Sequence, residues 1–169
     1  HSFACMQKIL VIQTAFIGDV VLATGLIEKL HQYFPGAQID FLVRQGNEGL
    51  LKDHPYLHKV LLWVKKENKL RNLWKLLNQI RHTRYDAVIN VQRFAATGFL
   101  TAFSNAQQKI GFDKNPFSFL FNKKIKHVIS TTNLATHEIE RNHQLIASLT
   151  DEFPAKPVLY PSEKDKAAV

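Results

Sequence analysis

Gly18 and Asp19 lie within TAFIGDVVLATGLI (residues 14–27), between an apolar run and a segment with helical spacing. A nucleotide-binding turn at this place would carry several glycines, as G-x-G-x-x-G or G-x-x-x-x-G-K-[ST], and the sequence contains neither pattern. An acidic side chain at a helix start also disfavours phosphate, because the free N–H groups there otherwise attract anions. We therefore do not expect this turn to hold a phosphate group.

Two roles for Asp19 remain open from its position alone. In the first, it stabilises the helix start through the macrodipole and the unpaired N–H groups. In the second, it is a carboxylate held at the edge of a sheet, where it can accept a proton from a bound hydroxyl. Orientation would have to supply most of the catalysis, because a carboxylate at a helix start is a weak base.

Basic residues follow the third predicted strand in the run WVKKENKLRNLWK (residues 63–75). If this run lies at the ligand-binding edge of a sheet, its first four cations suit phosphates or acidic sugars. The alternative is an ordinary solvated helix face. The candidates are Lys65, Lys66, Lys69 and Arg71.

Three further polar residues are candidates for the same edge. Arg93 directly follows the apolar segment YDAVINVQ (residues 85–92), where a strand is predicted to end. His137 and Arg141 are four residues apart and share one face of a predicted helix. Together with the neighbouring glutamates, the latter two form either a surface ion-pair network or a pair that faces the ligand.

Apolar runs alternate with helical patterns along the chain, which predicts a parallel sheet covered by helices on both faces. Right-handed crossovers would place the carboxyl ends of all strands at one edge, where ligands bind. Strands are expected at residues 8–13, 39–43, 59–64, 85–91, 109–112 and 126–130. Helices are expected at residues 17–34, 47–53, 69–83, 94–104 and 134–149.

The bulk composition is that of a folded domain with anionic partners. The 169 residues include 22 Lys and Arg against 14 Asp and Glu, a net charge of +8. Apolar runs are too short to span a membrane, and the scattered histidines predict neither a metal site nor a cofactor. Residues 1–5 are interpreted as an expression scar, which makes the single cysteine, Cys5, non-native.

Several segments, in order, resemble the ADP-heptose-dependent lipopolysaccharide heptosyltransferases of glycosyltransferase family 9. Residues 9–43 resemble the family's G-D run followed by FPGA-I-FLV. YDAVINVQ and KIGF (residues 109–112) resemble its Y-D-x-V-I-D-x-Q and R-x-G-F elements. HEIERNHQL (residues 137–145) resembles its H-x-V-E-R-N-x-x-L helix. The resemblance runs from Lys8 to about Pro161.

The resemblance implies a GT-B architecture, in which two Rossmann-like domains face each other across a cleft. Residues 6–155 would form the N-terminal, acceptor-binding domain. Residues 156–169 would begin a linker to a C-terminal domain that binds the nucleotide sugar. The implied reaction is an inverting, metal-independent transfer of heptose from ADP-heptose to the lipopolysaccharide inner core. This chain alone would be inactive.

Residue roles also follow from the resemblance. Asp19 would be the general base, and Thr14 and Gly18 beside it would contact the acceptor. The basic run, His137 and Arg141 would contact the acceptor as well. The family often has a small residue at the position of Arg93, so the contact expected of Arg93 from its place at the strand end would be specific to the acceptor of this protein. Asn90 departs from the family's usual aspartate, which leaves Asp19 as the sole candidate base.

The implied partners are a lipid-linked oligosaccharide acceptor and, through the C-terminal domain, ADP-heptose, without nucleic acid. We expect a cytoplasmic protein with peripheral contact at the inner face of the cytoplasmic membrane. Trp63, Trp74 and the phenylalanines from Phe112 to Phe121 would form the contacting platform, unless they pack in the core. A basic nucleic-acid-binding module and a small-molecule-binding regulatory domain remain alternatives.

Overall fold

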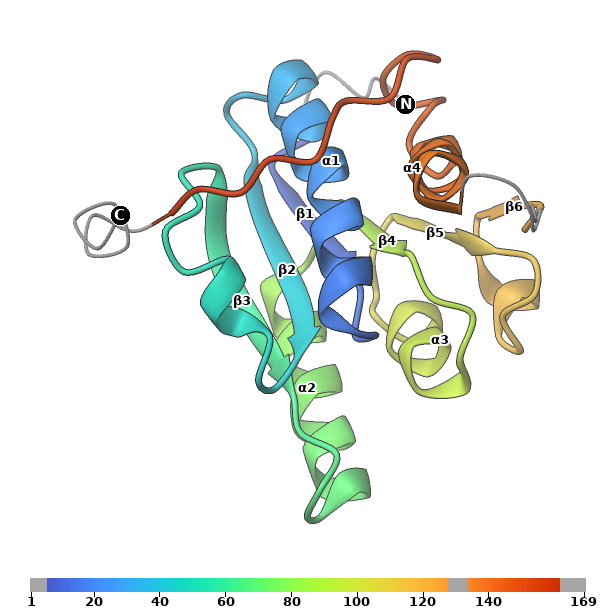
Figure 1. The fold of residues 1–169 in the computed structure, drawn as a ribbon. Helices are drawn as coiled ribbons and strands as arrows, with labels where there is room; N and C mark the ends of the chain where they lie inside the picture. The colour runs from blue at the N-terminus through green and yellow to red at the C-terminus, as the bar shows by residue number, and fades with distance from the viewer. Residues whose placement is uncertain (1–5, 128–133, 162–169) are drawn as a thin grey trace.

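The computed structural model describes residues 6–127 and 134–161 of the chain. Six parallel strands form one sheet in the order β3-β2-β1-β4-β5-β6 (Figure 1). The strands are β1 (Lys8–Ile12), β2 (Gln38–Arg44), β3 (Leu57–Trp63), β4 (Ala87–Asn90), β5 (Gln108–Phe112) and β6 (Lys123–Ile125). The helices are α1 (Ile17–Tyr33), α2 (Lys69–Thr83), α3 (Ala95–Ala102) and α4 (Leu134–Gln144), with short 3-10 turns η2 (Glu48–Leu50) and η3 (Ser118–Leu120).

Each central strand is buried on both faces, because helices cover both sides of the sheet. Alternate residues of β1 enter two separate apolar cores: Ile9 and Val11 pack with α1, whereas Leu10 and Ile12 pack with α2 and α3. The chain after α4 packs on the α1 side through Leu145 and its neighbours. The predicted parallel α/β sheet with helices on both faces is confirmed.

Three predicted elements are wrong in extent. The sixth strand is Lys123–Ile125 and not 126–130, because parallel pairing with β5 sets Lys123 beside Ile110; residues 128–130 lie outside the described part. The helix predicted at 134–149 ends at Gln144 and continues as tighter turns with i→i+3 hydrogen bonds. The helix predicted at 47–53 is only the three residues of η2, with a glycine at its centre.

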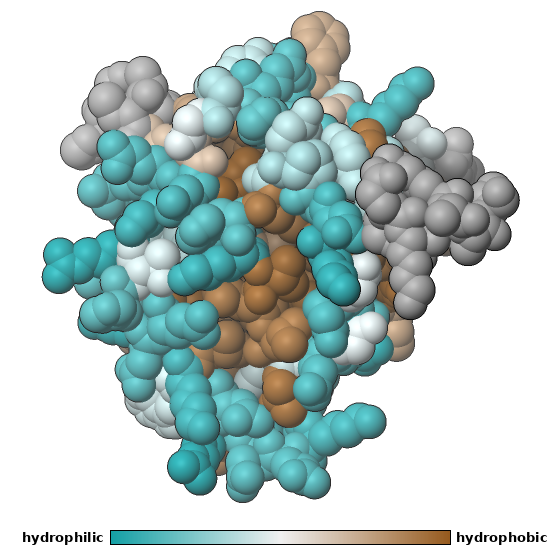
Figure 2. All heavy atoms as spheres, turned by 90° about the vertical axis from the view of Figure 1, so that its left-hand side faces the viewer, coloured by the Kyte–Doolittle hydropathy of each residue, from teal (hydrophilic) through white to brown (hydrophobic). Residues whose placement is uncertain are grey.

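The sheet edge at β3 is only partly covered. Figure 2 looks onto this side of the molecule and shows apolar side chains gathered in a central band between hydrophilic flanks. Val60 and Leu62 of β3 are partly exposed while they pack against the core. In the described ranges, no helix is both long enough and apolar enough to cross a bilayer.

Residues 151–160, here called the strap, run along α1 after the chain leaves α4 (Figure 1). The strap is held by the Val158 N–H, which donates to the Thr24 hydroxyl (3.2 Å), and by the Tyr160 hydroxyl, which donates to Glu28 (2.8 Å). Gly25 makes this approach possible, since a Cβ there would lie 2.7 Å from the Ala155 carbonyl oxygen.

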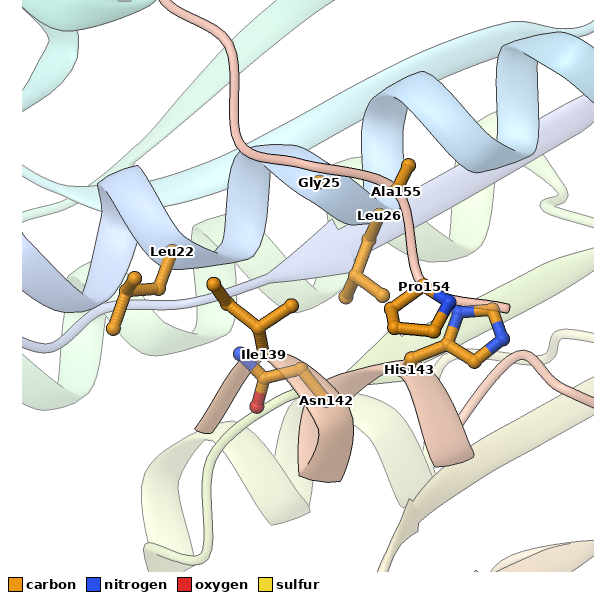
Figure 3. Close-up of a pocket in the computed structure, with 8 residues that line it drawn as sticks. All are labelled: Leu22, Gly25, Leu26, Ile139, Asn142, His143, Pro154 and Ala155. Carbon is orange, nitrogen blue, oxygen red and sulfur yellow. The ribbon is translucent and has the colours of Figure 1, made fainter. Parts of the chain in front are cut away.

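The junction of α1, α4 and the strap is closely packed. Its side chains close around a small gap between the two helices and the strap (Figure 3). At one end, the His143 ring lies 2.6 Å from the Asp151 carbonyl oxygen. The residues that meet there are Leu22, Gly25 and Leu26 of α1, Ile139, Asn142 and His143 of α4, and Pro154 and Ala155 of the strap.

His54 is buried beneath the strap in a neutral form. Its Nδ1 accepts the Tyr56 N–H (3.1 Å), which a doubly protonated ring could not do. Its Nε2 lies 3.5 Å from Glu28 Oε1 and has no hydrogen-bond partner among the described residues. Burial, with a smaller contribution from His31, lowers the pKa of His54 to about 4.

Stability should therefore fall as the pH is lowered through this range. Below pH 6.5 the unfolded chain binds a proton at His54, whereas the folded chain binds it only near pH 4. This difference lowers the free energy of unfolding by at most about 3 kcal/mol. Thermal unfolding of the wild type and of His54→Gln at a series of pH values measures this loss of stability. The stability of the variant should depend less steeply on pH. The exposed His82 is the matched control, and His82→Gln should keep the wild-type slope; equal slopes for the wild type and His54→Gln would contradict the assignment.

Candidate functional site

A hollow of about 310 Å³ opens to solvent at the carboxyl ends of β1 and β4. These two strands are neighbours in the sheet, although they are first and fourth in the chain. The strand order reverses at this point, which is where open α/β sheets bind ligands. The lining residues come from four segments: Gln13, Ala15, Phe16 and Asp19; Val91, Gln92, Arg93 and Phe94; His127; and Glu138 and Arg141.

Amide side chains connect the loop after β1 to the loop after β4 at the floor of the hollow. The Thr14 hydroxyl donates to Gln92 Oε1 (2.8 Å), and Gln92 Nε2 donates to Gln13 Oε1 (2.7 Å). Asn90 accepts the Gln92 N–H through Oδ1 (2.8 Å). These groups are buried. The network therefore fixes the spacing between the loop that carries Asp19 and the loop that carries Arg93.

Asp19 lies in the first turn of α1 and faces the hollow with its carboxylate. One oxygen, Oδ2, accepts the Phe16 N–H (3.1 Å), which caps the helix start. Among the described residues, no basic side chain forms an ion pair with Asp19. Both roles considered for this residue are thus compatible with its geometry, because the cap uses one oxygen.

Glu138 and Arg141 of α4 reach the hollow from the opposite side. Arg141 Nη2 lies 3.6 Å from Glu138 Oε1, and both side chains are about four-fifths buried. Burial and the neighbouring Asp19 carboxylate raise the pKa of Glu138, while Arg141 partly opposes the rise. The two acidic side chains are therefore close enough to interact electrostatically across the hollow.

His127 closes the side of the hollow near β6. Burial, followed by the positive charges of Arg141 and Arg93, lowers the pKa of His127 to about 4. Its imidazole is therefore neutral at pH 7. Its Nδ1 and the Nε of Arg141 are buried without a hydrogen-bond partner among the described residues. Such unused polar atoms suit a ligand that carries hydroxyl groups.

Asn115 holds the loop that carries Arg93 in place. Its buried side-chain amide donates to the carbonyl oxygens of Gln92 (3.3 Å) and Phe94 (3.1 Å). Its Oδ1 accepts the Phe117 N–H (3.0 Å). Gly98 of α3 leaves the room that this amide occupies, because a Cβ at Gly98 would overlap it.

Comparison with protein families places this chain. The profile of glycosyltransferase family 9 (heptosyltransferase) matches residues 73–168, more than half of the sequence. The chain belongs to this family. The resemblance found in the ordered sequence segments is thereby confirmed.

Relatives within family 9 are distant in sequence but similar in fold. Lipopolysaccharide heptosyltransferase 3 of Escherichia coli K12 is 30% identical over 143 residues, which cover 78% of this chain and 39% of that protein. The glycosyltransferase of family 9 from Veillonella parvula superposes with a TM-score of 0.79 at 22% identity, over 94% of this chain and 46% of that structure. E. coli ADP-heptose LPS heptosyltransferase II superposes with a TM-score of 0.73 at 21% identity, over 96% and 49%.

This family 9 chain spans less than half of the length of its curated relatives, between 30% and 43%. The structural neighbours below 25% identity establish the fold. They confirm that the parallel sheet corresponds to part of a larger glycosyltransferase architecture.

The family 9 structure brings together three of the predicted site residues, namely Asp19, Arg93 and Arg141. Lys65 and Lys66 line a separate hollow of about 580 Å³ with Arg44 and Glu48, beyond the ends of β2 and β3. The remaining predicted residues line neither hollow. Lys69 and Arg71 are exposed at the start of α2, Gly18 is exposed, Thr14 is in the buried network, and His137 lies 3.8 Å from Glu140 on the surface of α4.

Four groups at the site were not singled out from the sequence as ligand contacts. Glu138 and Arg141 are three residues apart on one helix face. The position that made Arg141 a candidate ligand contact therefore makes Glu138 one as well. His127 lies two residues after the end of β6, but the strand was predicted at residues 126–130, which include His127. Gln13 and Gln92 end two apolar runs, a position that predicts a strand-end loop without a specific role. The described residues contain no group of three or more His, Cys, Asp or Glu side chains arranged for a metal ion.

Proposed function

We propose that this chain is the acceptor-binding part of a glycosyltransferase that transfers heptose from ADP-heptose to the inner core of lipopolysaccharide. Membership of family 9 and the names of its relatives, which include lipopolysaccharide heptosyltransferases 1 and 3, support the heptosyl transfer. One neighbouring structure is an E. coli heptosyltransferase with an ADP-heptose analogue, which supports this donor. Residues 6–155 would form the acceptor-binding domain, and the donor would bind to a second domain.

The observation that carries the mechanism is the Asp19 carboxylate at the sheet's switch point. Asp19 would take the proton of the acceptor hydroxyl while the hydroxyl oxygen attacks the anomeric carbon of the heptose. Attack from the face opposite the ADP leaving group inverts the configuration, and one carboxylate is enough for this step. A single base contrasts with glycoside hydrolysis, which needs two carboxyl groups.

The cations around the hollow would complement the anionic partners of the reaction. Arg93 and Arg141 would bind acceptor phosphate or carboxylate groups, or stabilise charge on the departing diphosphate. We propose that transfer needs no metal ion, because fixed cations would serve the leaving group. Thr14 would contribute indirectly, by fixing the loop that leads to Asp19, and Lys65, Lys66, Lys69 and Arg71 would meet a larger acceptor beyond the hollow.

Transfer assays with the full-length protein test this function. Incubation with ADP-heptose and a heptose-deficient lipopolysaccharide core should give a heptosylated product of inverted anomeric configuration, measured by mass spectrometry and NMR. Excess EDTA should leave the rate unchanged. ADP-glucose and UDP-glucose are the matched donor controls and should give little product. Equal transfer from a different nucleotide sugar would contradict the proposed donor, and a rate abolished by EDTA would contradict metal independence.

A further inference from the structure

We propose that the surface formed by α2, the end of α3 and η3 docks on an anionic phospholipid bilayer. Five large apolar side chains on these elements are at least 40% exposed, and together they are called the apolar patch. The patch consists of Leu70, Trp74, Phe103, Phe119 and Leu120.

Aromatic rings connect α2, the end of α3 and the loop that leads into η3. Phe99 is the central ring, 5.8 Å from Trp74 of α2 and 5.2 Å from Phe103 between ring centroids. Phe117, next to η3, lies 6.1 Å from Phe99 and 6.2 Å from Phe103. Leu70 is one helical turn before Trp74. A group of this kind on a protein surface marks an interaction site.

Not every aromatic residue of the predicted platform belongs to this surface. Trp63, Phe112 and Phe121 are buried in the core, so the platform predicted from the sequence is wrong for these three. Trp74 and Phe119 are 58% and 72% exposed. The structure thus separates the aromatic residues that pack inside from those that face outward.

The charge of the surrounding segment complements an anionic bilayer. Residues 68–126, which include α2, α3 and η3, contain eleven Lys and Arg against two Asp and Glu. The two acids are engaged in the fold: Asp86 accepts the N–H groups of Gln7 and Lys8, and Asp113 accepts that of His127. The rest of the described chain contains nine Lys and Arg against ten Asp and Glu. The net positive charge is therefore concentrated in the part of the chain that carries the apolar patch.

Apolar side chains with basic neighbours distinguish a bilayer from the alternative of nucleic acid. Trp, Phe and Leu insert at the headgroup level, while Lys and Arg attract anionic lipid. Nucleic-acid readers on a sheet expose aromatic rings on the sheet face. Here both sheet faces are covered by helices, and the rings pack edge to face with one another.

Vesicle binding tests the proposal without any glycosyl transfer. Purified protein is mixed with sedimentable vesicles of phosphatidylcholine alone or of phosphatidylcholine with phosphatidylglycerol, both free of lipopolysaccharide. We expect binding to the anionic vesicles only, weakened by high salt. Because neither donor nor acceptor is present, the result is independent of the proposed function.

Trp74 reports directly on the contact, because Trp63→Phe leaves it as the only tryptophan of the chain. Its emission should shift to the blue on binding and be quenched by brominated lipid. The double variant Trp74→Ser/Phe119→Ser should weaken binding by about tenfold or more. Lys75→Glu/Lys114→Glu, which spares every predicted acceptor-binding residue, should weaken it similarly.

The matched control is Phe153→Ser, which removes an aromatic side chain that is 74% exposed on the strap. It should bind vesicles as the wild type does, and circular dichroism verifies that each variant is folded. The proposal is overturned if the wild type does not bind anionic vesicles, if binding leaves the Trp74 emission unchanged, or if Phe153→Ser weakens binding as much as the patch variant. Retention of duplex DNA without retention of vesicles would also overturn it.

Discussion

Asp19→Asn in the full-length protein should lower the rate of heptose transfer by about 10²- to 10⁴-fold, the usual contribution of a general base. The asparagine keeps an oxygen that can accept the Phe16 N–H, so the cap of α1 should survive. ADP-heptose affinity should stay nearly unchanged, because the donor would bind to another domain. Initial rates of product formation and calorimetric titration with ADP-heptose measure the two quantities.

Asp53→Asn is the matched control for this variant. Asp53 is an exposed carboxylate in the turn before β3, away from the hollow, and its replacement should leave the rate unchanged. If Asp19→Asn retained the wild-type rate, Asp19 would be only a helix cap. Glu138, whose pKa is raised beside it, would then be the remaining carboxylate at the hollow.

Gly98→Ala should destabilise the fold, although alanine normally stabilises a helix. The new methyl group would displace the Asn115 amide, and up to three hydrogen bonds, one buried and two partly buried, would be lost. The better helix propensity of alanine should offset about 1 kcal/mol of this loss. The free energy of unfolding should therefore fall by about 1–3 kcal/mol. Thermal unfolding should show a Tm lowered by roughly 3–10 °C.

Two further variants isolate the cause of that loss. Gly18→Ala places the same methyl group in α1 where no atom lies within 4 Å, and it should leave the Tm unchanged or raise it. Asn115→Ala should lower the Tm, and adding Gly98→Ala to it should cost nothing more, because the amide is already gone. A Tm raised by Gly98→Ala alone would show that Asn115 accommodates the methyl group without losing its hydrogen bonds.

The sequence predicted the architecture well because its periodicity is strong where burial is complete. α2 was predicted with its observed bounds, Lys69–Thr83, since its apolar residues recur at helical spacing. Leu76, Leu77 and Ile80 lie in one core, whereas Leu70 and Trp74 of the same pattern are exposed. β6 was misplaced because its residues, Lys123–Ile125, are mostly basic, and only pairing with β5 makes them a strand. Propensity favoured the more apolar residues that follow.

The candidate site was predictable only in part. The proximity of Asp19 to Arg93 follows from topology, because the carboxyl ends of neighbouring parallel strands meet. The approach of Glu138 to Asp19 depends on how α4 packs against α1, about 120 residues later in the chain, and no local pattern encodes it. The same holds for Asn115, whose amide has a role only because Gly98 leaves space for it.

α1 links two distant parts of the molecule mechanically. Its first turn carries Asp19, and its middle contacts the strap at Thr24, Gly25 and Glu28. The same helix therefore positions both the strap and the Asp19 carboxylate. A displacement of residues 155–160 relative to the sheet would have to break these hydrogen bonds or move the helix that carries Asp19.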